Sequence, residues 1–120
     1  MNQRLTLPFP PPLSACFTNV AGRGRVPTKR YTAWTKTALL ESAIQRPKRF
    51  PGEVSVWIGV VAPDRRARDC DNLLKPIMDF LKKSGVIVDD SNRFVRRISI
   101  EWLPAGSPVT VLINEIEAAA

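Results

Sequence analysis

Residues 54–85 read VSVWIGVVAPDRRARDCDNLLKPIMDFLKKSG and contain a strand pattern, a charged connection and a helix pattern in succession. Over residues 54–60, Val and Ile alternate with Ser, Trp and Gly, the period of two expected of a β-strand with one apolar face. The helix pattern ends at Ser84, before Gly85, and glycine commonly follows the end of a helix. The apolar stripe of this helix consists of Leu74, Ile77, Met78 and Leu81. The stretch therefore predicts a strand that leads through a charged loop into an amphipathic helix.

Pro76 complicates the start of that helix. Proline lacks an amide hydrogen and pushes the preceding residue, Lys75, away from helical angles. We therefore expect the regular helix to begin near Leu74 or to be kinked there. In either case Asp69 and Asp71 lie at a strand-to-helix connection, close to a helix N-terminus.

The flanking segments complete the predicted fold. Periodicity, capping and turn residues predict a strand over 3–7, a helix from Lys29 or Arg30 to about 45 capped by Thr28, and strands over 94–103 and 109–116. This order of elements is typical of an α+β (mixed α/β) fold. We expect one small domain over residues 1–120, with a mixed β-sheet and two main helices.

A proline-rich segment follows the first predicted strand. Residues 10–12 are all proline, so this segment must be extended and cannot pair as a central strand. A mobile loop is expected after it, running through Gly22-Arg23-Gly24-Arg25. Glycine freedom and arginine charge suit contact with a phosphate backbone, which makes Arg23 and Arg25 candidate DNA-binding residues. A plain flexible loop is the alternative.

Asp69 and Asp71 are two carboxylates inside a strongly cationic segment. In an extended backbone their side chains would point the same way, with Cα atoms roughly 7 Å apart, so both could reach one divalent cation or two neighbouring ones. The arginines at 65, 66 and 68 would bring in a phosphate, and the carboxylates a metal.

Each of these residues also has an ordinary structural explanation. Asp69 or Asp71 alone could cap the helix, although both cannot. Asp89 and Asp90 could be turn residues, Lys75 could form a routine helix ion pair with Asp71, and the arginines could belong to a solvated loop. The ordinary explanations account less well for the acidic residues, the lysine and the arginines occurring together than for each residue alone.

Composition excludes several kinds of site. The chain has no histidine, so an imidazole base, a Ser/His/Asp triad and a His-liganded metal are excluded. Cys16 and Cys70 form no CxxC pair, which argues against structural zinc. No secretory signal and no membrane-spanning apolar run are apparent, and we expect a reduced, cytoplasmic protein that binds no membrane.

Charge is unevenly distributed along the chain. The net charge is +7, and residues 1–68 carry twelve Lys and Arg against three Asp and Glu, whereas residues 69–120 carry six against eight. The basic half suggests a polyanionic partner, of which nucleic acid is the commonest.

Residues 63–90 resemble the RusA family of Holliday junction resolvases (crossover junction endodeoxyribonucleases). The resemblance lies in the Asp-x-Asp-Asn-x-x-Lys element at residues 69–75, in the Asp89-Asp90 pair that follows, and in the Leu-Pro-aromatic-Pro-Pro opening at residues 7–11. It covers nearly the whole chain, is strongest over 63–90 and is weak over 12–50. It implies a RusA-like fold and magnesium-dependent cutting of four-way DNA junctions by a homodimer, in a family often carried by prophages.

The resemblance also implies particular site residues. The family's catalytic, metal-binding carboxylates fall on Asp69, Asp71 and Asp90, its functional lysine falls on Lys75, and Asn72 matches the motif asparagine. The implied cofactor is Mg²⁺, with Mn²⁺ able to substitute. Carboxylate-bound magnesium can neutralise a phosphodiester and activate water without histidine, leaving Lys75 to contact the scissile phosphate and Arg65, Arg66 and Arg68 to hold the flanking backbone.

Symmetry supports a homodimer. A four-way junction is resolved by two matched nicks, and one chain offers a single acidic cluster, so two-fold assembly supplies both cuts. The apolar strands near the C-terminus are candidates for the interface. Two other functions remain open: a non-enzymatic basic nucleic-acid-binding module, and a metal nuclease that acts on other branched DNA such as flaps or forks.

Overall fold

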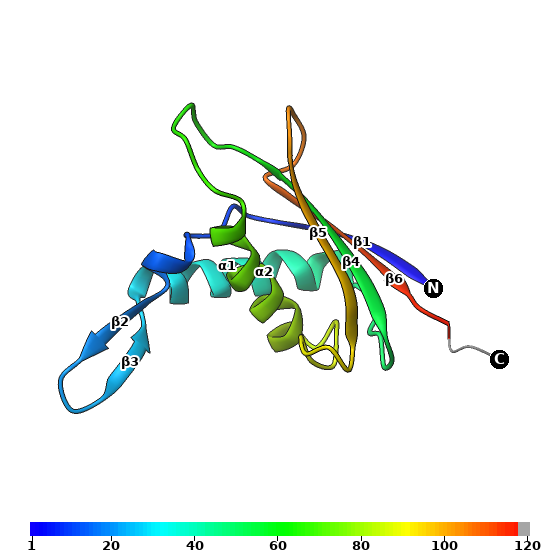
Figure 1. The fold of residues 1–120 in the computed structure, drawn as a ribbon, viewed down its shortest axis with the longest axis horizontal. Helices are drawn as coiled ribbons and strands as arrows, with labels where there is room; N and C mark the ends of the chain where they lie inside the picture. The colour runs from blue at the N-terminus through cyan, green and yellow to red at the C-terminus, as the bar shows by residue number, and fades with distance from the viewer. Residues whose placement is uncertain (118–120) are drawn as a thin grey trace.

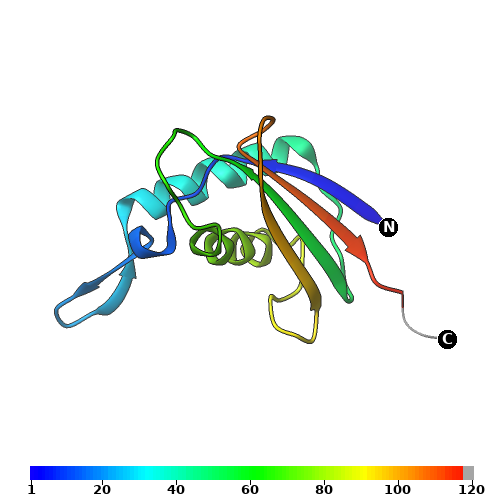
Figure 2. The ribbon, with the colours of Figure 1, turned by 45° about the horizontal axis from the view of Figure 1, so that its top comes forward.

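Four strands form one mixed sheet, and two helices lie against one of its faces (Figures 1 and 2). This is the architecture of the computed structural model, which describes residues 1–117. The elements are β1 (Asn2–Leu7), the 3₁₀ turn η1 (Leu13–Ala15), β2 (Phe17–Val20), β3 (Gly24–Pro27), α1 (Lys29–Gln45), β4 (Val54–Val61), α2 (Asp71–Ser84), β5 (Val95–Leu103) and β6 (Val109–Glu115). The expected mixed sheet with two main helices is confirmed.

The strand order of the sheet is β1-β6-β4-β5. β4 pairs with β5 in parallel and with β6 antiparallel, so Ile58 lies between Ile100 and Val111. Although β5 and β6 are consecutive in the chain, β4 separates them, and the turn between them does not close a hairpin. The parallel pair β4 and β5 is connected through α2, which therefore crosses the sheet face between them.

The core lies between the sheet and the helices. The inward residues of β4 are at most 2 % exposed, and they pack with Leu73, Ile77 and Leu81 of α2, each at most 1 % exposed. Fully burying a side chain of this size contributes about 1.5–3 kcal/mol. Trp34 of α1 meets Phe80 of α2 edge to face, with ring centroids 5.8 Å apart. These contacts fix both helices, and therefore the start of α2, relative to the sheet.

α1 begins and ends as its sequence predicts. The Thr28 hydroxyl accepts a hydrogen bond from the Tyr31 amide at 3.1 Å, which confirms Thr28 as the N-cap. At the other end, the Gln45 side chain accepts from the Thr6 amide and donates to the Thr6 carbonyl, both at 2.8 Å. The C-terminus of α1 thus occupies part of the outer edge of β1.

α2 begins three residues earlier than expected, at Asp71, and continues through Pro76. An interior proline costs about 3 kcal/mol, and the burial of Leu73 and Ile77 on either side is of comparable or larger size. Tertiary packing therefore outweighs the local penalty. Of the two alternatives, a start near Leu74 was wrong, and a kink there stays a prediction.

The segment expected to be a loop forms a β-hairpin, β2–β3, that projects from the body of the protein (Figures 1 and 2). Gly22 and Gly24 adopt φ of 77° and 74°, which glycine tolerates better than other residues, and they allow the chain to reverse there. Within residues 1–117, no helix has the length and apolar character needed to cross a membrane.

Candidate active site and nucleic-acid interface

Asp69 and Asp71 lie where the loop after β4 enters α2. Asp71 is the first helical residue, and Cys70, at φ −69° and ψ −24°, occupies the N-cap position. The Asn72 amide donates to the Asp69 carbonyl at 3.3 Å, which closes a turn. The backbone here is therefore helical rather than extended, so the expected alternation of side chains was wrong. Neither aspartate is the N-cap, and both are exposed at a helix N-terminus, where negative charge is favourable.

Lys75 lies one helical turn after Asp71 but pairs with other carboxylates. Its ammonium donates to Asp79 Oδ1 at 2.7 Å and to Asp90 Oδ2 at 3.5 Å. The hydrogen bond to Asp79, then the charge of Asp79 and that of Asp90, raise the pKa of Lys75 above its ordinary value. Lys75 is therefore a fixed cation on the face of α2. The alternative ion pair with Asp71 is not formed within the part of the chain that the structure describes.

Asp89 and Asp90 lie in a turn after α2, as their sequence predicts, and the turn is tied to the helix. Lys82 Nζ lies 2.9 Å from Asp89 Oδ1. This hydrogen bond, with a second from Ser91, lowers the pKa of Asp89 to about 2. Because Lys75 and Lys82 are seven residues apart, they lie on the same face of α2 and together hold the aspartate pair against it.

The three predicted carboxylate ligands are not assembled into one cluster. Among residues 1–117, no group of three or more Cys, Asp or Glu side chains is close enough to hold a metal ion. Asp69 and Asp71 lie at the start of α2, and Asp90 contacts Lys75. The donor chemistry nevertheless fits a hard divalent cation, because all three ligands are carboxylates and no salt bridge in the described chain engages Asp69 or Asp71.

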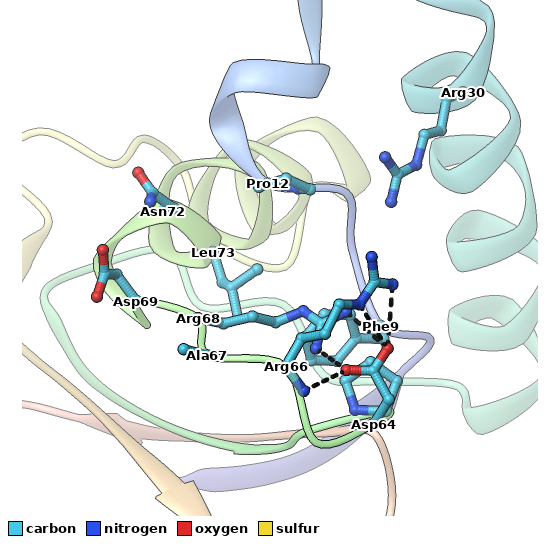
Figure 3. A pocket seen from close by; sticks show the side chains of 11 residues that line it. Phe9, Pro12, Arg30, Asp64, Arg66, Ala67, Arg68, Asp69, Asn72 and Leu73 are labelled. Carbon is cyan, nitrogen blue, oxygen red and sulfur yellow. Dashed lines mark hydrogen bonds and ion pairs between the residues drawn. The ribbon is translucent and has the colours of Figure 1, made fainter.

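Asp64 brings together two of the predicted DNA-binding arginines (Figure 3). Arg66 donates to Asp64 through its amide at 2.9 Å and through its guanidinium at 3.1 and 3.2 Å. Arg68 donates through both terminal nitrogens, one of them at 3.1 Å from Asp64 Oδ2. These bonds, led by that from Arg68, hold the pKa of Asp64 well below its usual range. One carboxylate thus fixes the direction of two cations.

A pocket of about 600 Å³ opens beside this cluster. Its walls come from the proline-rich segment, the first turn of α1, the loop after β4 and the first turn of α2 (Figure 3). They include Phe9, Pro12, Arg30, Asp64, Arg66, Arg68, Asp69, Asn72 and Leu73. The Arg68 guanidinium lies 5.8 Å from the centre of the Phe9 ring. Cations, one amide and an aromatic ring therefore surround one recess next to Asp69.

The remaining predicted DNA-binding residues lie elsewhere. Arg65 is exposed in the loop after β4 and does not line the pocket. Arg23 and Arg25 are exposed on the β2–β3 hairpin, where the Arg25 guanidinium lies 5.0 Å from the centre of the Phe17 ring. The predicted interface thus divides into the pocket, the loop and the hairpin.

Several residues of this region were not identified from the sequence. Phe9 and Arg30 are distant from the loop in the chain, and only the fold brings them to it. For Asp64 a local signal existed, because arginines two and four residues beyond an aspartate can fold back onto it. Asp79 carried a similar signal, being four residues beyond Lys75 on the same helix.

Comparison with known proteins finds one matching family and several relatives. A model of the family described as Endodeoxyribonuclease RusA matches residues 8–114. The chain is 29% identical over 118 residues to crossover junction endodeoxyribonuclease RusA of Shigella sonnei, covering 93% of each protein. It is 27% identical over 118 residues to the protein of that name from Enterobacteria phage 82, again covering 93% of each. Identity to the Aquifex aeolicus protein is 40% over 63 residues, or 52% of this chain and 50% of that protein.

Proposed function

This chain belongs to the RusA family of endodeoxyribonucleases, and we propose that it resolves four-way DNA junctions by paired nicks, with residues 1–120 acting as one endonuclease domain. The observation that carries the proposal is the setting of Asp69 and Asp71. They lie at a helix N-terminus, beside an arginine-lined pocket and one helical turn before the Lys75–Asp90 pair. Acidic groups surrounded by cations suit hydrolysis of a phosphodiester, because a protein that only binds DNA has no use for carboxylates at that position.

RusA-family nucleases are generally metal-dependent, and we propose Mg²⁺ as the metal here, with Mn²⁺ able to substitute. Asp69, Asp71 and Asp90 would hold it through carboxylate oxygens, the ligands that Mg²⁺ prefers. A divalent cation bound there supplies charge neutralisation and Lewis acidity toward a phosphodiester. The remaining catalytic functions fall to side chains of the protein itself.

Lys75 is proposed to contact the scissile phosphate. Its ammonium donates to Asp79 and Asp90, and like other lysines it is protonated at neutral pH. A fixed cation stabilises the negative charge that develops on phosphate oxygens during hydrolysis. Lys75, from α2, and Asp90, from the segment after α2, would thus belong to the same catalytic centre.

DNA binding is assigned to cations around that centre. Arg66 and Arg68, oriented by Asp64, would hold the backbone next to the cut, with Arg65 and Asn72 on either side of them. Arg23 and Arg25 would contact a more distant part of the DNA, because they lie on the projecting hairpin (Figure 1).

The active species is proposed to be a homodimer, since two related cuts need two centres. Mixing the wild-type protein with excess Asp90→Asn subunits should give heterodimers that nick one strand but rarely resolve the junction. Light scattering that shows a monomer, together with undiminished paired cutting in the mixture, would contradict the dimer.

Cleavage of a synthetic four-way junction beside a linear duplex of the same sequence, with and without Mg²⁺, tests the function. We expect Mg²⁺-dependent cutting of the junction and little cutting of the duplex. Flap and fork substrates in the same assay would reveal a nuclease for other branched DNA. No cutting of any substrate, with Mg²⁺ binding unchanged after Asp69, Asp71 and Asp90 are replaced by Asn, would favour a non-enzymatic binding module.

A further inference from the structure

We propose that the pocket beside Asp69 receives one unstacked nucleotide of branched DNA, with its base against the Phe9–Arg68 pair and its phosphate toward Arg30 and Arg66. This inference rests on the proposed function and names the part of the DNA that the site recognises. The pocket adjoins the proposed centre, since Asp69 is one of its walls, but the inference concerns DNA recognition and assigns no step of the cutting chemistry to the pocket.

The first argument is the kind of surface that Phe9 and Arg68 make together. The guanidinium lies over the Phe9 ring at 5.8 Å from its centre, and Asp64 holds it there from the side. Nucleobases stack on aromatic rings and on arginine planes alike. Leu73 also borders the recess, but it is 1 % exposed and belongs to the core, so the Phe9 ring is the main apolar surface there. A flat, poorly hydrated base suits this lining better than a bare phosphate does.

The second argument is the placement of charge. Arg30 projects from the first turn of α1 toward the Asp64 cluster, so cations face the pocket from two sides (Figure 3). Arg30 is exposed and enters no salt bridge within residues 1–117, so its charge is available to a ligand. Asn72 adds one amide that can both donate to and accept from a base edge. Cations combined with an aromatic ring are the usual features of sites for unpaired nucleic acid.

The third argument is size. A volume of about 600 Å³ lies within the range of about 300–1,000 Å³ typical of small-ligand pockets, and it suits one nucleotide rather than a base pair. Taking a base out of an intact duplex costs a few kcal/mol, and less where the base is already unpaired. A pocket of this kind therefore favours branched DNA over a linear duplex.

The test is a double-mutant cycle on binding, performed in EDTA so that no cutting occurs. Kd is measured for the wild-type protein and for Phe9→Leu, on junctions that carry either normal nucleotides or one abasic residue beside the branch point. Phe9→Leu should weaken binding of the normal junction on the order of tenfold, because stacking contributes about 1–3 kcal/mol per base. The same substitution should have little effect on the junction whose abasic residue removes the stacked base.

Two further variants control for altered folding. Phe9→Trp keeps an aromatic face and should retain the binding and its dependence on the base. Phe17→Leu removes an aromatic ring on the hairpin, outside the pocket, and should show no coupling to the abasic residue. Additive effects of Phe9→Leu and the abasic residue at every position beside the branch would overturn the proposal.

The outcome is separable from that of the proposed function. If the protein cuts junctions selectively but Phe9→Leu and the abasic residue show no coupling, the proposed nucleotide pocket is rejected and the proposed resolvase function stands. If the protein showed no preference for junctions, the same cycle on a duplex with one extra unpaired nucleotide would decide the pocket independently. Coupling on that duplex would support the nucleotide-pocket proposal, and additive effects on it would reject the proposal.

Discussion

The ammonium nitrogen of Lys75 lies 3.5 Å from Oδ2 of Asp90, a residue fifteen positions further along the chain. This contact joins the first half of α2 to the turn that follows it. It also places a cation from the Asp-x-Asp-Asn-x-x-Lys element beside the third predicted carboxylate. The two parts of the sequence motif therefore meet through a lysine rather than through a cluster of acids.

Lys75→Ala is predicted to reduce the cleavage rate far more than it weakens binding. Loss of one cation that stabilises developing charge typically costs about 100-fold or more in rate, whereas many other cations hold the DNA. Single-turnover rates and Kd on the same junction measure both effects. Lys83→Ala, on the same helix and outside every salt bridge of residues 1–117, is the matched control. Parallel losses of rate and affinity would make Lys75 only a docking residue.

Asp71→Asn is predicted to abolish cutting while leaving junction binding intact or tighter. The amide is a poorer ligand for a divalent cation, and loss of one negative charge reduces repulsion of phosphate. Gel-shift and cleavage assays on one preparation measure both properties. Glu41→Gln makes the same change of charge at an exposed position of α1 and should leave cutting unchanged. Normal cutting by Asp71→Asn would remove this residue from the site.

Asp64→Asn is predicted to strengthen binding to linear duplex and to lower the preference for junctions. The substitution removes the carboxylate charge that partly neutralises Arg66 and Arg68, so both hold phosphates of any DNA more strongly but are no longer oriented for the junction. Each added phosphate contact steepens the dependence of log K on log salt by about 0.9, and we expect an increase of one to two such contacts. Glu53→Gln, whose closest contact with Arg96 is 3.9 Å, is the control of equal charge. An unchanged slope would show that the Asp64 cluster does not compete with DNA.

Lys82→Ala is predicted to raise the pKa of Asp89 from about 2 toward its ordinary value near 3.9. Because folding lowers this pKa, the pair stabilises the fold above about pH 4, and the contribution is lost as the pH falls toward 2. The pair is exposed to solvent, so the effect on unfolding should be small. Carbon NMR of the Asp89 carboxyl in the wild-type and variant proteins measures the shift. Identical titration curves would show that Lys82 does not hold the turn.

Much of the fold could be predicted from local signals. Alternation in β4, the Thr28 cap and the glycine after Ser84 are short-range features, and the structure keeps them. The start of α2 could not be predicted, because the local penalty of Pro76 is outweighed by burial against a distant sheet. The strand order could not be predicted either, since no local pattern places β4 between β5 and β6.

The candidate site could be predicted only in part, for a related reason. The position of the Asp-x-Asp element at a strand-to-helix connection follows from neighbouring residues and was predicted correctly, although the helix begins three residues earlier than expected. The contact between Lys75 and Asp90 depends on how the turn after α2 folds back, which short-range patterns do not specify. The pocket requires Phe9 and Arg30 to approach the loop from separate elements, so its existence depends on the tertiary structure.

The central claim, that this protein resolves four-way junctions, is tested most directly by mapping nicks on each strand of an end-labelled junction in Mg²⁺. The account predicts two nicks at symmetric positions in opposing strands, and duplex products whose nicks DNA ligase seals. Nicks at unrelated positions, or equal cutting of a linear duplex with the same sequence, would contradict it.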